Sequence, residues 1–476
     1  MRRMKKIAVV LCLLSLVGCT KKPAPGLPVE SSSEEVTDSS EAEHLNETET
    51  GEVPVIVPFP GHEGTGETGL SKLENPRTLI LGTDIHYVSE ELEDGGRAFR
   101  QMIDHGDGKL PNYVREITDA FLEEVIDQHP QALILSGDLS LNGEKKGHQA
   151  LAKKLEKVEE QGIPVLVIPG NHDIYCQDAA EYTKDERLPT EQTSPEDFEE
   201  IYASFGYEEA ISQDLYSLSY VYELDADTRL LMLDTCQYED GYARVGGMIK
   251  TETYEWIEEQ LAEAWEEGCQ VIPVGHHNLL DESQVYVEDC TIEHAEELET
   301  MLGDWGVTWF LSGHLHVQHF KTSEDSGISE VVTSSLSTAP CQYGIIEYDT
   351  DGTFDYRTRK IDVEAWAERT GQEDENLLEF RSYAAEKLQE VFFNEAYEGL
   401  KNKGINKQDK TTMAELYGRL NSFAVAGNAL EIREEILEDP AYAMWQEKDG
   451  ASILYRYIEE MLGDAVIDYN QFTNRK

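Results

Sequence analysis

Short runs of β-branched and leucine residues alternate with amphipathic stretches of helical period through the first two thirds of the chain. Brief apolar runs bounded by turn residues are typical of buried strands. The predicted strands cover residues 78–82, 132–135, 165–168, 230–233, 271–274 and 308–311, and the predicted helices cover 114–126, 149–160 and 254–265. Strands that alternate with helices predict an α/β core.

The pattern changes in the last third of the chain. Segments 330–333, 344–348 and 354–358 are predicted to be antiparallel additions to the core, with Thr350, Asp351 and Gly352 as a hairpin turn. From residue 364 to 476 the apolar residues recur every three or four positions, which predicts a helical C-terminal region. This region contains no cluster of metal-ligand residues, so we expect it to pack against the core.

The first 19 residues have the anatomy of an export signal. Basic residues precede an apolar run over 7–17 that is too short to span a bilayer. The run ends in Leu16-Val17-Gly18-Cys19, which resembles a bacterial lipobox. In proteins of that kind the cysteine is diacylated, and two acyl chains give stable membrane attachment. We therefore expect an extracytoplasmic protein anchored to the cell membrane by lipid on Cys19; an ordinary secretory signal is the alternative.

Residues 20–70 are rich in Glu, Ser, Thr, Pro and Gly and poor in aromatic residues. Such a composition cannot bury enough apolar surface to offset the entropy of ordering. This segment is predicted to be a disordered acidic linker that holds the folded part away from the membrane.

The net charge limits the size of the substrate. The chain has 95 acidic and 39 basic residues, a formal net charge of −56. A surface this negative repels polyanions, which argues against long nucleic acid and against anionic membrane faces. A small phosphate ester can still bind where metal cations reverse the local field.

Seven cysteines are present, of which Cys12 would leave with the signal and Cys19 would carry lipid. The other five lack the spacing of a disulfide scaffold or a zinc knuckle. They are interpreted mainly as small buried hydrophobic residues: Cys176, Cys236, Cys269, Cys290 and Cys341.

Five polar motifs follow predicted strands and carry the candidate chemistry. They are Asp84-Ile85-His86, Gly137-Asp138, Gly170-Asn171-His172-Asp173, Gly275-His276-His277 and Gly313-His314-Leu315-His316. Ligands collect outside the carboxyl ends of strands in open α/β sheets, so the five motifs are expected to converge in one crevice. Carboxylate and imidazole ligands suit Mn, Fe or Zn, and the lack of paired thiolates argues against a structural zinc site.

In this order the motifs resemble the pattern D-x-H, G-D, G-N-H-D/E, G-H and G-H-x-H of the calcineurin-like metallophosphoesterase superfamily. The resemblance runs from about residue 78 to 316, with closing strands to about 359. Asn142-Gly143-Glu144 and the form Gly-Asn-His-Asp are similar to the branch that contains bacterial cyclic-nucleotide phosphodiesterases, including secreted members with a helical extension. The resemblance implies a four-layer β-sandwich flanked by helices over residues 71–363 and a small α-helical domain over 364–476.

The resemblance also implies a site with two divalent transition metal ions, Mn, Fe or Zn. One ion would be held by Asp84, His86, Asp138 and His316, and the other by Asp138, Asn171, His276 and His314. Asp138 would then bridge the two ions, and the role of His277 is left open.

Two cations about 3.5–4 Å apart can share a water and lower its pKa, so that hydroxide attacks phosphorus in line. His172 is the candidate general acid for the leaving alkoxide, with Asp173 as the partner that orients its ring. The alternative for His172 is a structural histidine in the core or at the surface.

Other polar or aromatic positions give weaker signals. For His148 a solvated position is favoured over a substrate contact. Tyr175 could stack on a planar group of the substrate or pack in the interior. The segments 91–110 and 176–213 fall between motifs and are expected near the mouth of the crevice, as lids or specificity loops.

The favoured function is a metal-dependent phosphoric ester hydrolase that acts on small diesters such as cyclic nucleotides. A phosphomonoesterase, for example a nucleotidase, would use the same site. A non-catalytic metal-containing binding lipoprotein is a third interpretation, but it would be expected to have lost ligands, and here the set is complete. An extracytoplasmic enzyme of this kind could scavenge phosphate from released nucleotides. The sequence predicts no particular oligomeric state.

Overall fold

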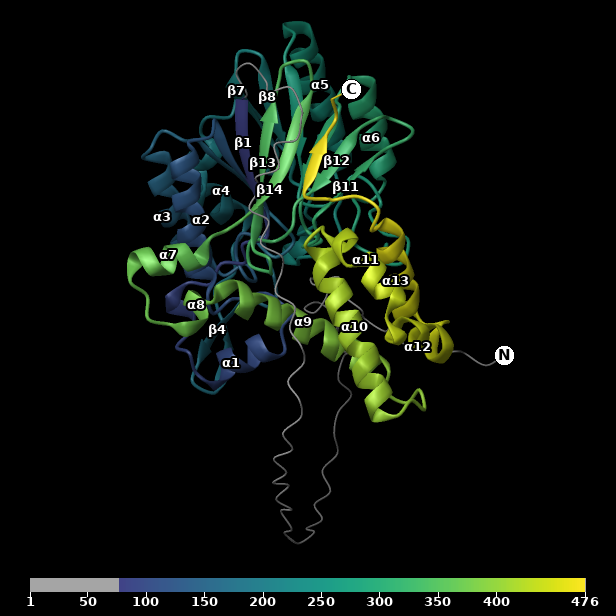
Figure 1. The fold of residues 1–476 in the computed structure, drawn as a ribbon. Helices are drawn as coiled ribbons and strands as arrows, with labels where there is room; N and C mark the ends of the chain where they lie inside the picture. The colour runs from purple at the N-terminus through teal and green to yellow at the C-terminus, as the bar shows by residue number, and fades with distance from the viewer. Residues whose placement is uncertain (1–76, 476) are drawn as a thin grey trace, which may run out of the picture.

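The computed structural model describes residues 77–475. The predicted signal segment with Cys19 and the predicted linker 20–70 lie outside these residues. The described part of the chain forms two mixed β-sheets with helices on their outer faces and a helical C-terminal region (Figure 1). The predicted α/β fold class is therefore confirmed.

The first sheet has six strands in the order β15-β14-β13-β1-β2-β3. β1, β2 and β3 run parallel, and β13 and β14 add antiparallel at the β1 edge. The residues of β2 and β3 are all buried, as expected for parallel strands that are covered on both faces. The bounds are β1 Arg77–Gly82, β2 Ala132–Ser136, β3 Val165–Ile168, β13 Gln342–Tyr348, β14 Phe354–Lys360 and β15 Gln471–Thr473.

The second sheet has seven strands in the order β11-β12-β10-β9-β8-β7-β6. Its bounds are β6 Ser212–Gln213, β7 Tyr220–Asp225, β8 Thr228–Met232, β9 Gln270–Val274, β10 Trp309–Ser312, β11 His319–Thr322 and β12 Ser329–Val332. The prediction that segment 330–333 is antiparallel to the core is wrong, because β12 is parallel to β10 and antiparallel only to β11. The unpredicted strand β11 reverses the chain before β12 enters the sheet.

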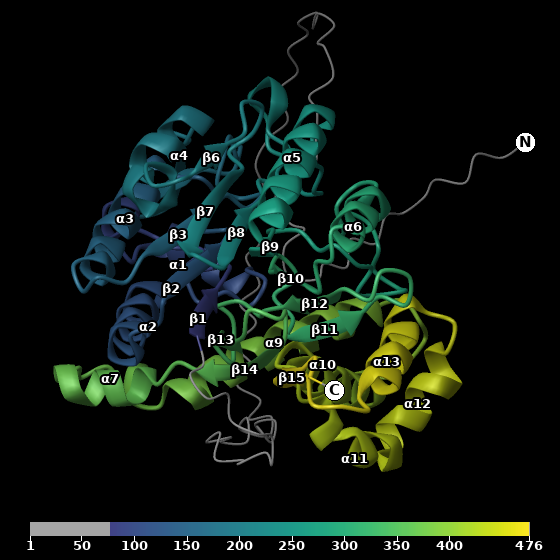
Figure 2. The ribbon, with the colours of Figure 1, turned by 90° about the horizontal axis from the view of Figure 1, so that it is seen from above.

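Helices cover the outer face of each sheet (Figure 2). α2 (Val114–Gln128) and α3 (Lys145–Glu159) lie on the first sheet, and α5 (Thr251–Glu267) and α6 (Ala295–Asp304) lie on the second. The buried stripes of α2, α3 and α5 match the periodicity seen in the sequence, whereas α6 was not predicted. Two short helices, α1 (Arg97–Asp104) and α4 (Pro195–Ile201), and the hairpin of β4 (Ala180–Thr183) and β5 (Glu186–Pro189) lie in the inserts between motifs.

The C-terminal region is helical, as predicted. Its elements are α7 Val363–Thr370, α8 Glu375–Leu378, α9 Phe380–Gly399, α10 Lys407–Val425, α11 Arg433–Glu438, α12 Pro440–Asp449 and α13 Ile453–Asp464. α9 and α10 pack along each other, and the fully buried Trp445 of α12 donates its indole N–H to the carbonyl of Met413 over 2.8 Å. None of the helices within residues 77–475 is long and apolar enough to cross a membrane.

One strand departs from the helical prediction. β15 pairs antiparallel with β14 and closes the edge of the first sheet, where Phe472 packs on Phe320 and Phe354. Its three residues carry no periodic signal, since the pairing is made with a strand more than a hundred residues earlier. The last residues of the chain therefore return to the sheet from which the helical region departs.

The five cysteines of the described residues form no disulfide. Cys176, Cys236, Cys290 and Cys341 are buried, and Cys269 is half-buried. This matches the interpretation of these residues as small hydrophobic side chains.

Candidate metal centre

All five polar motifs leave strands at the same end of the two sheets. Asp84 and His86 follow β1, Asp138 follows β2, and Asn171 follows β3, while the histidine pairs follow β9 and β10 in the second sheet. Backbone hydrogen bonds join neighbouring loops, for example from Asp84 N to the Gly137 carbonyl over 3.0 Å. The structure thus brings together residues that lie up to 232 positions apart in the sequence.

The backbone of these loops is strained where the candidate ligands are attached. Asp84, His86, Asp138, His314 and His316 all have φ between 48° and 70°. Residues other than glycine adopt this left-handed region at a cost of about 1–3 kcal/mol, and such residues cluster at functional sites. The strain turns each side chain toward the centre of the crevice.

Two glycines allow the loops that carry Asp138, Asn171 and His276 to approach one another closely. A Cβ at Gly170 would lie 2.2 Å from Oδ1 of Asp138, and a Cβ at Gly137, which has φ +99°, would lie 2.5 Å from Nδ1 of His276. Both distances are impossible for a real side chain. The glycines that precede Asp138 and Asn171 are therefore required by the geometry of the site.

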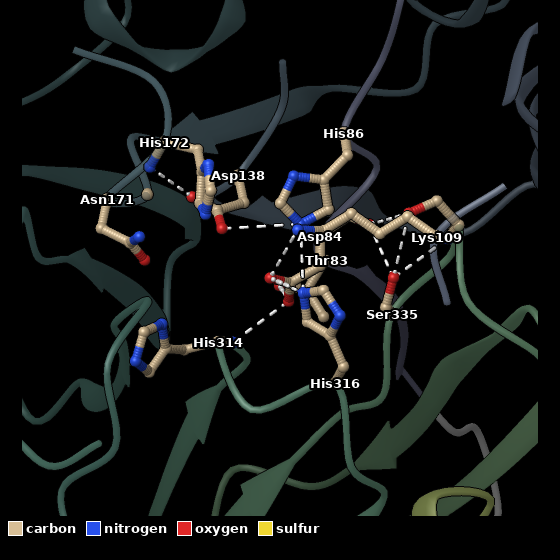
Figure 3. Close-up of polar contacts among 12 residues, drawn as sticks. Thr83, Asp84, His86, Lys109, Asp138, Asn171, His172, His314, His316 and Ser335 are labelled. Carbon is tan, nitrogen blue, oxygen red and sulfur yellow. Dashed lines mark hydrogen bonds and ion pairs between the residues drawn. The ribbon is translucent and has the colours of Figure 1, made fainter. Parts of the chain in front are cut away.

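The first cluster contains Asp84, His86, Asp138 and His316, whose ligand atoms all lie within 4.8 Å of one another (Figure 3). Nε2 of His316 is 3.0 Å from Oδ1 of Asp84 and 3.1 Å from Nε2 of His86, which in turn is 3.6 Å from Oδ2 of Asp138. Oδ1 of Asp84 and Oδ2 of Asp138 are buried and have no hydrogen-bond partner. Their lone pairs point into the space that the imidazoles surround.

The second oxygen of each carboxylate is held by the protein. Oδ2 of Asp84 accepts hydrogen bonds from Oγ1 of Thr83 (2.7 Å) and from the backbone N–H of His314 (3.1 Å). Oδ1 of Asp138 accepts from the backbone N–H of His172 at 2.8 Å and lies 3.5 Å from Nε2 of His276. Oδ1 of Asp138 thus lies beside His276 and Oδ2 beside His86, so the carboxylate is placed between the two groups of ligands.

The second group of candidate ligands lies on the His276 side of Asp138. Nε2 of His276 is 3.2 Å from Oδ1 of Asn171, and its Nδ1 donates to the carbonyl of Ser136 at 2.8 Å. His314 donates from Nε2 to the carbonyl of Asp289 at 2.9 Å, which leaves its buried Nδ1 without a partner. Backbone carbonyls that fix the tautomer of a histidine in this way are typical partners of metal-binding imidazoles.

His277 lies within the same 4.8 Å of His276 and His314, but both of its ring nitrogens are engaged. Nδ1 accepts from Oγ1 of Thr235 (2.7 Å), and Nε2 donates to the carbonyl of Val245 (2.8 Å). A ring with no free lone pair cannot bind a cation. We assign His277 to packing beside the site.

Bound cations would stabilise the buried carboxylates of the site. Asp84, Asp138 and Asp173 are fully buried close together. Burial raises the pKa of Asp138 well above its usual range, and the charges of Asp84 and Asp173 raise it further. Burial also opposes ionisation of Asp84, but the His316 ring beside it holds the pKa of that carboxyl below its usual range. Buried carboxylates with free lone pairs are strongly destabilising unless they are paired or bind metal.

Two of the imidazoles, those of His86 and His314, favour the neutral form that binds metal ions. Burial, with the positive charge of Lys109, lowers the pKa of His86 well below its usual range. Burial lowers the pKa of His314 to about 3. Neutral imidazoles, buried carboxylates and an amide oxygen form a donor set for divalent transition metals, so the residues present fit a site for two ions.

The candidate general acid, His172, lies beside the first cluster. Its ring makes an edge contact with His86 at 5.1 Å between centroids, and its buried Nε2 has no hydrogen-bond partner. Nδ1 donates to Oδ1 of Asn142 at 3.1 Å. Nε2 is therefore the nitrogen that faces the reaction space.

Asp173 does not orient the ring of His172 as the sequence suggested. Its carboxylate accepts four hydrogen bonds, from the backbone N–H groups of Leu139, Ser140 and Gly170 and from Oγ of Ser140, at 2.8–3.0 Å. A buried donor left unsatisfied costs about 1–3 kcal/mol. Asp173 therefore fastens the loop after β3 to the loop after β2.

Sequence reasoning gave no role to two polar residues at the site. Asn142 orients His172, although it lies 30 positions away. Lys109 reaches toward Asp84 and His86 from the insert between α1 and α2 (Figure 3), and its ammonium is paired with Asp107 at 2.8 Å. The only signals in the sequence were the Asn142-Gly143-Glu144 motif and the position of the insert between two motifs.

The structure also shows where the two residues with weaker sequence signals, His148 and Tyr175, lie. His148 is fully buried, with Nδ1 3.0 Å from the hydroxyl of Tyr202 and Nε2 3.2 Å from the Asp173 carbonyl, so both the solvated position and the substrate contact are wrong. Its partners come from distant segments, which the local sequence does not reveal. Tyr175 packs against the hydrophobic core.

Comparison with solved structures found low identity. A dimetal phosphatase from Danio rerio is 14% identical with a TM-score of 0.42, and the alignment covers 60% of this chain and 97% of that one. Phosphopantetheinyl hydrolase from Mycobacterium tuberculosis is 12% identical with a TM-score of 0.29, covering 55% of this chain and 90% of that one. No curated protein matches the chain.

Comparison with protein families is more informative. Residues 362–468 match the family described as the C-terminal domain of cyclic nucleotide phosphodiesterase. Residues 78–318, which include every candidate ligand, match the family described as calcineurin-like phosphoesterase. That match spans half of the chain, and the chain therefore belongs to the calcineurin-like phosphoesterases.

Proposed function

We propose that this metal-dependent phosphoesterase is a phosphodiesterase that hydrolyses small diesters, with cyclic nucleotides as the favoured substrates. The observation that carries the proposal is the complete set of buried donors next to a cavity that can hold an organic group. The match of residues 362–468 to a cyclic nucleotide phosphodiesterase domain supports the choice of a diester.

The side chains divide the work between them. Asp84, His86, Asp138 and His316 would hold one ion, and Asp138, Asn171, His276 and His314 the other. Two bound ions supply a nucleophile at neutral pH and offset charge on the phosphate oxygens. His172, in the form that carries a proton on each ring nitrogen, would give the Nε2 proton to the departing alkoxide and return to the neutral ring, while Asn142 holds Nδ1–H in place. The left-handed loops keep the ligands preorganised, so little reorganisation accompanies the reaction.

The test compares a diester with its monoester on the Mn²⁺-loaded protein. We expect a higher kcat/KM for bis(p-nitrophenyl) phosphate than for p-nitrophenyl phosphate, followed by turnover of cyclic nucleotides. Preference for the monoester would assign a phosphatase to the same site. Absence of turnover with both esters, in protein shown to contain metal, would favour the binding-protein interpretation.

We infer that the protein is a lipid-anchored extracytoplasmic enzyme and that it recovers phosphate from released nucleotides. The support is the sequence Leu16-Val17-Gly18-Cys19 behind a basic and apolar leader. Cys19→Ser is expected to shift the protein from the membrane fraction to the soluble fraction of a bacterial host. Retention in the membrane fraction would contradict the anchor, and a protein that ignored nucleotides but cleaved glycerophosphodiesters would contradict the scavenging role.

A further inference from the structure

A cavity of about 680 Å³ opens beside the metal centre. His172 and Asn142 form its inner wall, so it begins where the candidate general acid faces the reaction space. Its other walls come from α1 and the loop after it, from the β4–β5 hairpin, and from α9 of the C-terminal region, which lie together below the sheets in Figure 1. The volume is within the range of sites that bind small organic molecules.

Much of the wall is apolar. Six of the hydrophobic residues that line it come from three separate segments: Ala98, Met102, Ile103, Leu141, Val391 and Phe392. The last two belong to α9, so the helical region supplies part of the surface next to the catalytic histidine. A wall of this kind favours a flat uncharged group over a hydrated ionic one.

The charged residues of the cavity are mostly acidic. Lys109 is paired with Asp107 at 2.8 Å and Arg187 with Asp178 at 2.9 Å, so both cations already have a carboxylate partner. Asp185 and Glu395 add two more carboxylates. Glu395 is half-buried on α9, and burial raises the pKa of its carboxyl to about 7, so Glu395 carries a full negative charge only above about pH 8.

We propose that this cavity binds one organic group of a phosphate diester and that it selects an uncharged group over one that carries a second phosphate. The proposal rests on the proposed phosphodiesterase function. With the reacting phosphate at the metal ligands, an ester substituent on the His172 side projects between α1 and α9. A second phosphate on that substituent would meet four carboxylates and only two cations, both of which are paired, and would be repelled.

The proposal that the cavity binds an organic group of the substrate is tested by filling the cavity. Val391→Trp places an indole on its α9 wall, and Asn394→Trp, which adds the same group to an exposed position of α9, is the matched control. With thymidylyl-thymidine as substrate, Val391→Trp is expected to lower kcat/KM about tenfold or more while metal content is unchanged. Asn394→Trp should stay within about twofold of the wild type. Equal values for the two variants would overturn the proposal.

The proposal that the cavity repels a second phosphate is tested with the same dinucleotide, with and without a terminal phosphate. The wild-type protein is expected to prefer thymidylyl-thymidine about tenfold or more over at least one of its two monophosphorylated forms. At about pH 8.5, where Glu395 is ionised, Glu395→Gln should reduce this preference for the unphosphorylated dinucleotide. Glu390→Gln, five residues earlier on α9 and paired with Lys387 at the surface, should leave the preference unchanged. A wild-type protein that cleaves all three dinucleotides equally well would overturn the charge selection.

The failure of this inference is distinguishable from failure of the proposed function. If bis(p-nitrophenyl) phosphate is hydrolysed but the Val391, Asn394 and Glu395 variants behave alike on the dinucleotides, the phosphodiesterase stands and the cavity assignment is wrong. If the metal-loaded protein hydrolyses none of the diesters, both are wrong.

Discussion

Replacing Asp138 with asparagine is expected to lower kcat by about three orders of magnitude and to lower metal content in parallel. Oδ2 of Asp138 faces the first ligand cluster without a partner, and Oδ1 lies 3.5 Å from Nε2 of His276. Asparagine keeps the shape but removes the charge and turns one of the two oxygens into an N–H donor. Metal analysis by mass spectrometry together with steady-state kinetics measures both effects.

The same substitution is also expected to affect the stability of the metal-free protein. Asp138 is buried among carboxylates that oppose its ionisation, so its loss should leave the melting temperature of the metal-free protein unchanged or raised. A variant that retains both metals and normal turnover would contradict the assignment of Asp138 as the shared ligand. A fall in stability without loss of metal would point to a structural carboxylate instead.

His172→Ala is expected to reduce kcat by about 10²–10⁴-fold while the protein keeps its metals. The ring touches His86 from the side and belongs to neither ligand cluster, so its removal leaves the donor set intact. The loss should be largest for diesters of alcohols, whose alkoxides need a proton, and smaller for p-nitrophenyl esters, whose phenolate is stable without one. Kinetics with the two kinds of ester measure this difference.

Asn142→Ala is the companion variant for His172. It leaves the ring in the site but removes the oxygen that holds Nδ1, so a loss of about 10–100-fold is expected. If His172→Ala lowered both ester classes equally, a proton-donor role would be contradicted. Loss of metal from the His172→Ala variant would place His172 among the ligands.

Local patterns were sufficient to predict which residues the fold brings together, because each motif follows its strand within a few residues. Asp84 and His86 follow the end of β1, and β1 pairs in parallel with β2. Both residues therefore lie beside Asp138, which follows β2. The predicted helices and most predicted strands depend on periodicity, which is also local. These features were therefore visible without knowledge of the tertiary structure.

Long-range partners could not be predicted in the same way. The direction of β12 depends on β11, whose polar residues do not read as a buried strand. His148 resembles a surface residue until Tyr202 and the Asp173 carbonyl are placed around it. Asp173 stands next to His172 in the sequence, but its side chain turns toward Ser140 and Gly170, because four backbone and hydroxyl donors converge there.

The return of β15 to the sheet has a consequence for motion. The helical region leaves the first sheet after β14, and the chain returns through β15, which pairs with β14, so both ends of the region are fixed at β14. A domain with a single linker can swing about a hinge, whereas one tied at both ends cannot rotate away without breaking strand pairing. α9 therefore belongs to a region that is held to the first sheet at both of its ends. Removal of residues 471–475, which include β15, is expected to release one of these two attachments and to leave the region held only where it follows β14.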